Sequence, residues 1–380
     1  MMTRRERLLA TLRGEAVDRP AVNFYEVGGF DVKPDDPDPF NVYNAPDWRP
    51  LLQLAEDQTD LIRMRCPVLR PAADNPRDAF FQTETRVEGG SRFVQTTLRV
   101  GGRTLSGLTR RDRDVDTVWT LEHLLKDLDD LHAYLQLPAE VFHYEPELAH
   151  LEEAERAVGD RGIVMVDVAD PLCHAAQLFS MADYTVIALL EPVLFHQLLA
   201  KLAADIHART EKVARAFPGR LWRIYGPEYA AEPYLPPSLF EQYVGTYTRP
   251  MVDAIQRYGG FARIHCHGRL RAVIGHIVAM GGAGLDPIEP PPAGDMELAE
   301  VRRRYGRELV LFGNLEARDI ENLPPAEFAR KVAQSVREGT AGAGRGFVLM
   351  PSASPYGRTI SANTLKNYEL MVTLAQSFGG

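Results

Sequence analysis

Short apolar runs alternate with longer amphipathic stretches through the second half of the chain. The runs cover residues 162–169, 220–226, 261–268, 283–289, 308–315 and 346–354, and a segment with helical periodicity follows each of them. Strands that are apolar on both faces are typical of a parallel sheet that helices cover on each side. The pattern therefore predicts six successive strand–helix units and an α/β fold.

The amino-terminal part of the chain is less regular but supplies two further strands. Residues 19–26 and 61–69 are short runs with strand character. Together with the six later units they make eight, the number that closes a (β/α)8 TIM barrel. Since no Pro/Gly-rich linker divides the chain, we expect a single barrel domain over residues 1–380.

Two segments of the first half interrupt the barrel pattern. Residues 80–105 alternate polar and apolar positions around a Gly-Gly pair, which predicts a β-hairpin inserted into the barrel. Residues 26–48 are rich in Pro, Asp and Gly and predict a long loop. That loop is either a lid over the barrel or a surface excursion.

The composition is that of an ordinary globular protein, with 380 residues of which 45% are hydrophobic and 25% charged. A formal charge of −9 argues against nucleic acid as a partner, because phosphate backbones bind basic surfaces. No apolar run reaches the ~18 residues of a membrane span, and the basic segment 1–15 lacks the apolar core of a signal peptide. Cys66, Cys173 and Cys266 form no CxxC motif. We therefore expect no disulfide framework, no membrane contact and a cytoplasmic location.

Polar side chains collect where the predicted strands end. In TIM barrels the active site lies at the carboxyl ends of the strands, where the loops that follow them meet. Convergence of several such strand ends is a stronger signal than any single motif. The sequence predicts a mouth lined by Tyr25, Glu26, Asp167, Asp170, Glu228, Tyr229, His265, His267, Asp286, Glu289, Asn314, Glu316, Ser352 and Ser354.

The segment "RIHCHGRL" places two histidines at the end of one predicted strand. Because strand side chains alternate between faces, His265 and His267 point the same way and Cys266 points to the opposite side. Two imidazoles and one carboxylate are a common ligand set for catalytic zinc, and Glu228 ends the neighbouring strand. The sequence thus favours Zn²⁺ on Glu228, His265 and His267. Two alternatives stay open, in which the histidines bind a substrate without metal or have a structural role.

We expect the other residues of the mouth to divide into two groups. A carboxylate in this position is an acid, a base or the partner that orients a histidine, and Asp286 and Glu289 keep all three interpretations. Arg269 would contact an anionic substrate or begin the next helix in solvent. The expected catalytic residues are Asp167, Asp286, Glu289 and Tyr356, and the expected substrate-binding residues are Tyr25, Asp170, Tyr229, Arg269, Asn314 and Ser354.

Five segments spread over nearly the whole chain resemble a known family. They are "TRRERLLATLRGEAVDRPAV", "RIHCHGRL", "GLDPIEPPP", "LFGNL" and "VLMPSASPYGRTISANTLKNY". They resemble the uroporphyrinogen decarboxylase superfamily, and the resemblance implies a (β/α)8 barrel. Some members decarboxylate uroporphyrinogen III without a cofactor. Others are zinc-dependent methyltransferases that move methyl groups between corrinoid proteins and thiols such as coenzyme M.

The chain departs from both kinds of member at the site. The first strand of true decarboxylases runs into an Arg-Gln-Ala-Gly-Arg motif that binds carboxylates, whereas "NFYEVGGF" here contains no arginine. The methyltransferases carry His-x-Cys-Gly and Pro-Gly-Cys-Gly; here His267 replaces the first cysteine and Ala353 stands in place of the second. A site without thiolates is harder and suits oxygen ligands better. This departs from methyl transfer to a thiol and leaves transfer from a methyl ether or a methylamine open.

The leading hypothesis is a zinc-dependent methyltransferase that acts on a small methyl donor, with a corrinoid as substrate or carried by a partner protein. One rival is a metal-free decarboxylase of a small or tetrapyrrole-like carboxylic acid. The other is a tetrapyrrole or corrinoid binder without catalysis. A homodimer is a further expectation that the sequence leaves open.

Overall fold

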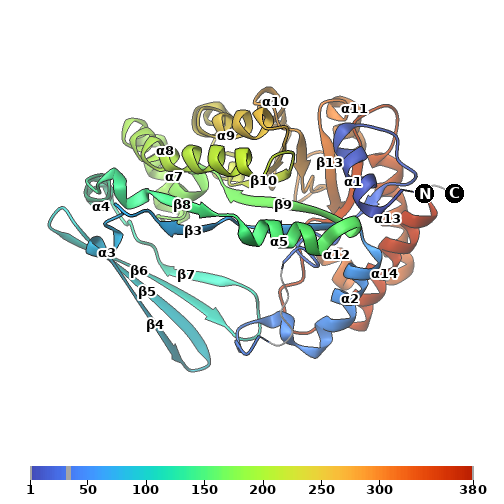
Figure 1. Cartoon of the computed structure of the whole chain (residues 1–380), viewed down its shortest axis with the longest axis horizontal. Coiled ribbons are helices and arrows are strands. Elements are labelled where there is room, and N and C mark those ends of the chain that lie inside the picture. The colour runs from blue at the N-terminus through green and yellow to red at the C-terminus, as the bar shows by residue number, and fades with distance from the viewer. Residues whose placement is uncertain (1, 31–35, 379–380) are drawn as a thin grey trace.

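The structure is a computed structural model that describes residues 2–30 and 36–378. Eight parallel strands form one curled sheet in the order β1, β14, β13, β12, β11, β10, β9, β2, which follows the chain when it is taken as a circle. With helices on its outer face (Figure 1), the sheet has the TIM-barrel-like arrangement that the apolar runs predict. The strands are β1 Ala21–Val22, β2 Leu61–Arg65, β9 Gly162–Ala169, β10 Leu221–Tyr225, β11 Phe261–His265, β12 Gly284–Asp286, β13 Val310–Leu315 and β14 Phe347–Pro351.

The two edge strands, β1 and β2, approach each other at Asp60. The backbone N–H of Asp60 donates to the carbonyl oxygen of Val22 at 2.8 Å, and the Val22 N–H donates to Asp60 Oδ2 at 2.9 Å. The buried carboxylate of Asp60 also accepts hydrogen bonds from Arg7 at 2.6 Å and from Arg19 at 2.8 Å. Asp60 therefore links the two edges of the curled sheet and neutralises two arginines there.

Two apolar cores lie on the two sides of the sheet. Inside the curl, Met165, Phe312 and Met350 belong to one buried cluster with Leu8 and Leu12. These leucines come from the first helix, whose apolar face packs on the residues that begin the strands. The interior of the sheet is therefore a packed core rather than a channel, and in such barrels ligands bind at the carboxyl end of the strands.

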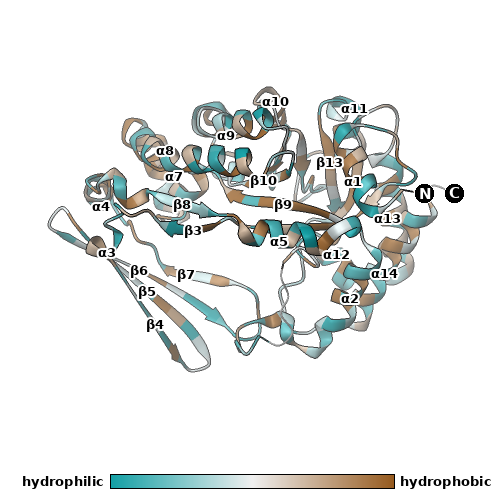
Figure 2. Ribbon diagram, viewed as in Figure 1, coloured by the Kyte–Doolittle hydropathy of each residue, from teal (hydrophilic) through white to brown (hydrophobic). Residues whose placement is uncertain are grey.

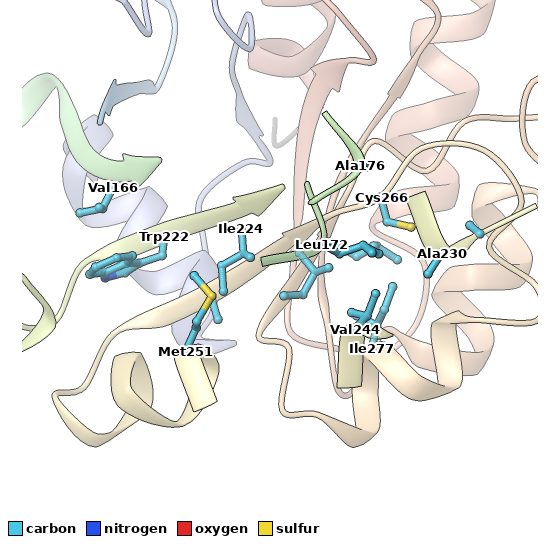
Figure 3. Close-up of a cluster of buried hydrophobic side chains, with 14 of the residues drawn as sticks. Val166, Leu172, Ala176, Trp222, Ile224, Ala230, Val244, Met251, Cys266 and Ile277 are labelled. Carbon is cyan, nitrogen blue, oxygen red and sulfur yellow. The ribbon is translucent and has the colours of Figure 1, made fainter. Parts of the chain in front are cut away.

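The larger core lies between the sheet and the helices. Figure 3 shows part of it, where Trp222, Ile224 and Cys266 of the strand side face Met251 and Ile277 of the helices. In Figure 2 the strand β9 is brown over most of its length, as expected for a strand that is covered on both faces. Burial of these apolar side chains holds the helices on the sheet.

Most of the helices form the outer layer, and the termini lie on the same side of the molecule (Figure 1). Among the described residues no single helix is both long and apolar enough to cross a membrane, and only the bent pair α7–α8 passes that test jointly. The helices are α1 Arg4–Arg13, α2 Arg49–Gln58, α3 Arg77–Phe80, α4 Leu128–Leu135, α5 Ala149–Val158, α6 Pro171–Ala176, α7 Met181–Leu190, α8 Pro192–Ala216, α9 Thr246–Arg257, α10 Ile274–Ala279, α11 Leu298–Tyr305, α12 Ala317–Asn322, α13 Pro325–Gly339 and α14 Ala362–Ser377.

An antiparallel insertion separates β2 from β9. The predicted hairpin over 80–105 falls on β4 and β5, which pair across Gly89 and Gly90 with positive φ angles of 56° and 83°. The insertion is larger than that hairpin, because β6 and β7 extend the sheet to four strands, which project from the barrel in Figure 1. Its strands are β3 Val68–Pro71, β4 Phe81–Glu88, β5 Ser91–Val100, β6 Arg103–Asp112, β7 Val118–Glu122 and β8 Tyr144–Glu147, of which β3 and β8 form a separate pair.

Two excursions of the first half return to the carboxyl end of the sheet. The predicted loop 26–48 contains two short 3₁₀ turns, and its residues 31–35 lie outside the described residues. Tyr43 of this loop donates a hydrogen bond to Asp116 of the insertion at 2.9 Å. The Asp116 N–H in turn donates to the carbonyl oxygen of Tyr356 at 2.7 Å. The loop and the insertion thereby join the rim of the barrel mouth.

The link at Asp60 makes a stability prediction. Asp60→Ala removes the buried carboxylate that Arg7 and Arg19 share, although Arg7 keeps its second partner Asp18. Loss of one partner of a buried ion pair typically costs about 3–5 kcal/mol. We expect a loss of unfolding free energy in that range, measured by urea denaturation. Asp57→Ala, at an exposed position of α2, should change stability by less than about 0.5 kcal/mol. Equal effects of the two substitutions would contradict the role given to Asp60.

Candidate active site

A cavity of about 250 Å³ opens at the carboxyl ends of the strands. We call it the mouth cavity. Its walls come from the ends of β1, β10, β11 and β14, and from the two excursions that meet there. The side chains that line it are Tyr25, Glu26, Tyr43, Asp116, Arg223, Tyr225, Glu228, His265, His267, Ser352, Ala353, Ser354, Pro355 and Tyr356.

His265 and His267 both face the mouth cavity, as the strand alternation predicts. Their ring centroids are 4.6 Å apart and their planes are nearly perpendicular, at 89°. Cys266, between them, is fully buried, and Figure 3 shows its sulfur in the apolar cluster behind the sheet. The cysteine therefore belongs to the core, and the two imidazoles form one wall of the cavity.

Asp286 holds His265 in place from below. Its Oδ2 lies 2.8 Å from His265 Nδ1, and the Arg263 guanidinium donates to both carboxylate oxygens at 2.5 and 2.6 Å. Burial opposes the charge, but Arg263 and His265 outweigh it and keep the pKa of Asp286 well below its usual value. Asp286 was expected to be catalytic; because it is fully buried and both oxygens are occupied, it is instead a positioning residue.

Glu289 holds His267 in the same way. Glu289 Oε1 lies 3.0 Å from His267 Nδ1, and Oε2 accepts the backbone N–H of Gly268 at 2.9 Å. Burial disfavours the charged form of each group, but the hydrogen bond between His267 and Glu289 favours both charged forms and outweighs the effect of burial. The pKa of His267 is raised and the pKa of Glu289 is lowered. Glu289, which the sequence placed among the catalytic groups, therefore contacts a histidine rather than the cavity.

The two histidines fit a metal in their donor chemistry. A carboxylate at Nδ1 fixes the imidazole tautomer and leaves the Nε2 lone pair for a metal, the usual arrangement around ligating histidines. Within the described part of the chain neither His265 nor His267 uses its Nε2 atom in a hydrogen bond. However, no group of three or more His, Cys, Asp or Glu side chains among residues 2–30 and 36–378 is arranged to hold a metal ion. The imidazoles fit zinc, and the predicted triad with Glu228 is not assembled.

Glu228 reaches the cavity through a turn that requires glycine. Gly226 has a φ of +120°, and a Cβ on it would lie 2.2 Å from Asp170 Oδ1. Its N–H donates to Glu228 Oε2 at 3.0 Å, which occupies one oxygen of the expected metal ligand. Asp170 itself is fully buried and caps α6 by accepting from the N–H of Cys173 at 2.7 Å. The structure therefore places Asp170 in the cap of α6 and not among the side chains that line the mouth cavity.

A second buried ion pair lies beside the histidines. Arg223 donates to Asp167 Oδ1 at 2.6 Å and to Oδ2 at 3.0 Å, and also donates to the Tyr25 hydroxyl. Arg223 is only 7% exposed. Because both Asp167 oxygens are bound to a permanently charged guanidinium, Asp167 is not available as the predicted acid or base. The pair instead places one cation and the Tyr25 ring at the floor of the mouth cavity.

Besides the two histidines, Glu26, Ser354 and Tyr356 are available to a ligand at the mouth. Burial raises the pKa of Glu26, which favours a protonated carboxyl group in the cavity. Ser354 is 4% exposed, and its hydroxyl has no hydrogen-bond partner among the described residues. Tyr356, expected to be catalytic, stands at the rim with 57% exposure. These groups provide a proton donor, a hydrogen-bonding hydroxyl and an aromatic rim.

Three of the expected substrate contacts lie away from the mouth cavity. Asn314 accepts a hydrogen bond at 2.9 Å from Ser335 of the outer helix α13. Arg269 is paired with Glu232 at 3.1 Å on the surface. Tyr229 packs against other tyrosines of the outer core. The structure therefore does not bring these three side chains to the mouth cavity.

Two residues of the site, Arg223 and Arg263, were not predicted, although the sequence contains a signal for both. Arg223 and Arg263 are single charges inside otherwise apolar strands, and Arg263 lies two positions before His265 on the same strand face. A charge in a buried strand needs a partner, so both arginines pointed to the barrel interior. Tyr43 and Asp116 gave no comparable signal, because only the tertiary fold brings them to the mouth.

Comparisons with known proteins agree with this fold. Residues 121–375 match the family model described as uroporphyrinogen decarboxylase (URO-D). A methyltransferase from Methanosarcina mazei superposes over 100% of both chains with a TM-score of 0.61 at 14% sequence identity, which shows a shared fold. The superposition with a B12-independent methionine synthase from Shewanella sp. W3-18-1 covers 76% of each chain at 10% identity, and its TM-score is only 0.40. No curated protein sequence matches the chain.

The Arg223–Asp167 pair predicts a strong difference between single and double substitution. Asp167→Asn leaves the buried Arg223 cation without its carboxylate and should cost about 3–5 kcal/mol of unfolding free energy. Arg223→Met with Asp167→Leu removes both charges and should cost clearly less, because no buried charge stays unpaired. Urea denaturation of the three proteins measures both values. A double substitution that costs as much as Asp167→Asn, or more, would contradict this account of the pair.

Proposed function

Because the chain belongs to the uroporphyrinogen decarboxylase family, we propose that it is a zinc-dependent methyltransferase of that family, acting on a small methyl donor. The observation that supports the proposal most is the pair of imidazoles at the mouth. Each is held at Nδ1 by its own carboxylate, Asp286 for His265 and Glu289 for His267. The Methanosarcina mazei protein of the same fold is called a methyltransferase, which makes this reaction class the first to test.

The ligand set favours an oxygen or nitrogen substrate over a thiol. Imidazole and carboxylate ligands are harder than thiolates, and Cys266 is buried on the other side of the sheet. A zinc ion on His265, His267 and one carboxylate would act as a Lewis acid toward the heteroatom that carries the methyl group. Methyl ethers and methylamines are the matching donors.

The protein's own side chains supply the remaining steps. When the methyl group leaves an ether oxygen or an amine nitrogen, that heteroatom must gain a proton. Glu26 is the group for this step, because burial raises its pKa and it lines the cavity. The free Ser354 hydroxyl donates a hydrogen bond to the donor molecule and orients it.

The mouth cavity is large enough for a small methyl donor but too small for a corrinoid. A volume of about 250 Å³ lies below the ~300–1,000 Å³ of pockets that bury drug-sized ligands. A small methyl donor fits inside. A corrinoid is far larger, so it would receive the methyl group at the opening, carried by a partner protein. Methyl transfer can be assayed with free cob(I)alamin as the methyl acceptor, because its absorbance changes when it is methylated.

A metal-free decarboxylase is the second candidate, and one observation favours it. The buried Arg223 guanidinium and the Glu26 carboxyl group lie at the same cavity, with Nη1 and Oε1 3.9 Å apart. A cation that holds a carboxylate and an acid that protonates the carbanion are what decarboxylation of a small acid requires. Activity that survives complete removal of metal would favour this candidate over methyl transfer.

Metal analysis of the purified protein tests the proposed site. His265→Ala and His267→Ala should each lose bound zinc, and the double variant should be little worse than either single, because the ligands act as one unit. Cys266→Ser should keep the metal and lose only about 1–2 kcal/mol of stability for a polar group in the core. Zinc loss in Cys266→Ser alone, with zinc retained in both histidine variants, would contradict the site.

The third ligand has a test of its own. We expect Glu228→Gln to lose zinc, whereas Glu289→Gln, which only loosens His267, should weaken zinc affinity by about 10–100-fold. Competition with a chelator of known affinity measures both variants. The reverse order would assign the third ligand to Glu289.

The protein should not act on uroporphyrinogen III. The mouth cavity is small, and its buried arginine is already paired with Asp167. An octacarboxylate would therefore find no room, and one arginine could not pair with its eight carboxylates. Conversion to coproporphyrinogen at ~1 s⁻¹ or faster, a usual enzymatic rate, would overturn this prediction.

A further inference from the structure

A second cavity, of about 160 Å³, lies behind the mouth. We call it the side cavity. It is bounded by the ends of β2, β9 and β10 and by the helices α6 and α8. Tyr225 lines both cavities, and the Asp167–Arg223 ion pair stands between them. Most of the wall is apolar, formed by Leu69, Ile206 and Trp222 among others.

The polar side chains of the side cavity are short of partners. Arg209 is 18% exposed, and its one ion pair is with Asp205 at 3.4 Å. Among the described residues its guanidinium makes no hydrogen bond, although it carries five N–H donors. In the same part of the chain neither the His174 ring nor the Tyr225 hydroxyl has a hydrogen-bond partner. Three polar groups on three different elements therefore face one small cavity without a hydrogen-bond partner among the described residues.

The charges in the side cavity favour an anion. Burial and the neighbouring Arg209 lower the pKa of His174 to about 4, so His174 is neutral at pH 7. Burial raises the pKa of Tyr225, which stays protonated. Asp205 offsets part of the Arg209 charge, and Asp167 is bound to Arg223. Arg209 thus offers a positively charged guanidinium with paired N–H donors, whereas the His174 imidazole and the Tyr225 hydroxyl each offer one neutral donor.

We propose that the side cavity binds a small carboxylic acid with an apolar body, whose carboxylate pairs with Arg209 and whose body packs on Leu69, Ile206 and Trp222. A guanidinium binds a carboxylate through two parallel hydrogen bonds. A dianionic phosphate would exceed the charge available and would leave the apolar wall empty. The volume is close to that of the ~150 Å³ cavities that hold a benzene ring. The proposal does not depend on the metal or on methyl transfer.

Cys66 gives a local readout of the side cavity. It lines the cavity and is exposed, whereas Cys173 and Cys266 are 2% and 0% exposed. Iodoacetamide therefore alkylates Cys66 first, and mass spectrometry locates the product. Desolvation beside the cavity wall, with the charge of Asp167, raises the pKa of the Cys66 thiol to about 11, so all rates are compared at one fixed pH.

Benzoate and benzamide are matched probes that differ in charge. We expect benzoate at millimolar concentrations to slow the alkylation of Cys66 in a saturable way and benzamide at equal concentrations to leave the rate unchanged. This comparison uses the unmodified protein, so it holds whether or not a variant folds. Equal protection by both probes, or no protection by benzoate, would overturn the proposal.

Two substitutions in α8 test whether the positive charge of Arg209 binds the benzoate carboxylate. Arg209→Gln should raise the benzoate concentration for half-protection by about ten-fold or more, the usual loss for a charged hydrogen-bond pair. Arg215→Gln removes the same charge from an exposed position of α8 outside the cavity and should leave protection unchanged. An equal loss in both variants, or none in Arg209→Gln, would show that benzoate does not bind to Arg209 in this cavity.

Discussion

The carboxylate of Asp286 is the charge around which the site is organised. It is fully buried and is shared between the Arg263 guanidinium and the His265 ring. A buried charge is tolerated only when it is paired and hydrogen-bonded. The side chains of Asp286, Arg263 and His265 are therefore fixed in position relative to one another. That arrangement directs the free edge of His265 to the opening. The neighbouring Arg223–Asp167 pair obeys the same constraint one strand away.

These ion pairs also divide the space at the carboxyl end of the sheet. On one side lies the mouth cavity, with two imidazoles, a carboxyl group whose pKa burial raises and a free hydroxyl. On the other side lies the side cavity, where Arg209 has a single weak partner. Tyr225 is the side chain that the two spaces share. The rigid pairs between them allow each cavity to have its own chemistry.

The sequence predicts most of the strand order and only part of the site. Apolar periodicity is local, so six strand–helix units and the facing of His265 and His267 were visible in it. The direction of a side chain beyond the last strand residue is not local. That direction depends on turns and neighbouring helices, and the Asn314 side chain accordingly accepts a hydrogen bond from Ser335 of α13. Asp116 comes from an insertion whose position no periodicity encodes, and the hydrogen-bond partners of Arg263 emerged only from the fold.

Zinc K-edge X-ray absorption of the zinc-loaded protein tests the central claim, a metal site at the mouth built without thiolates. The account predicts a first shell of nitrogen and oxygen only, at about 2.0–2.1 Å, with the multiple-scattering pattern of two imidazoles. His265 and His267 are the source of both rings, and either alanine variant should remove that pattern. A sulfur neighbour at about 2.3 Å, or a spectrum that both variants leave unchanged, would contradict it.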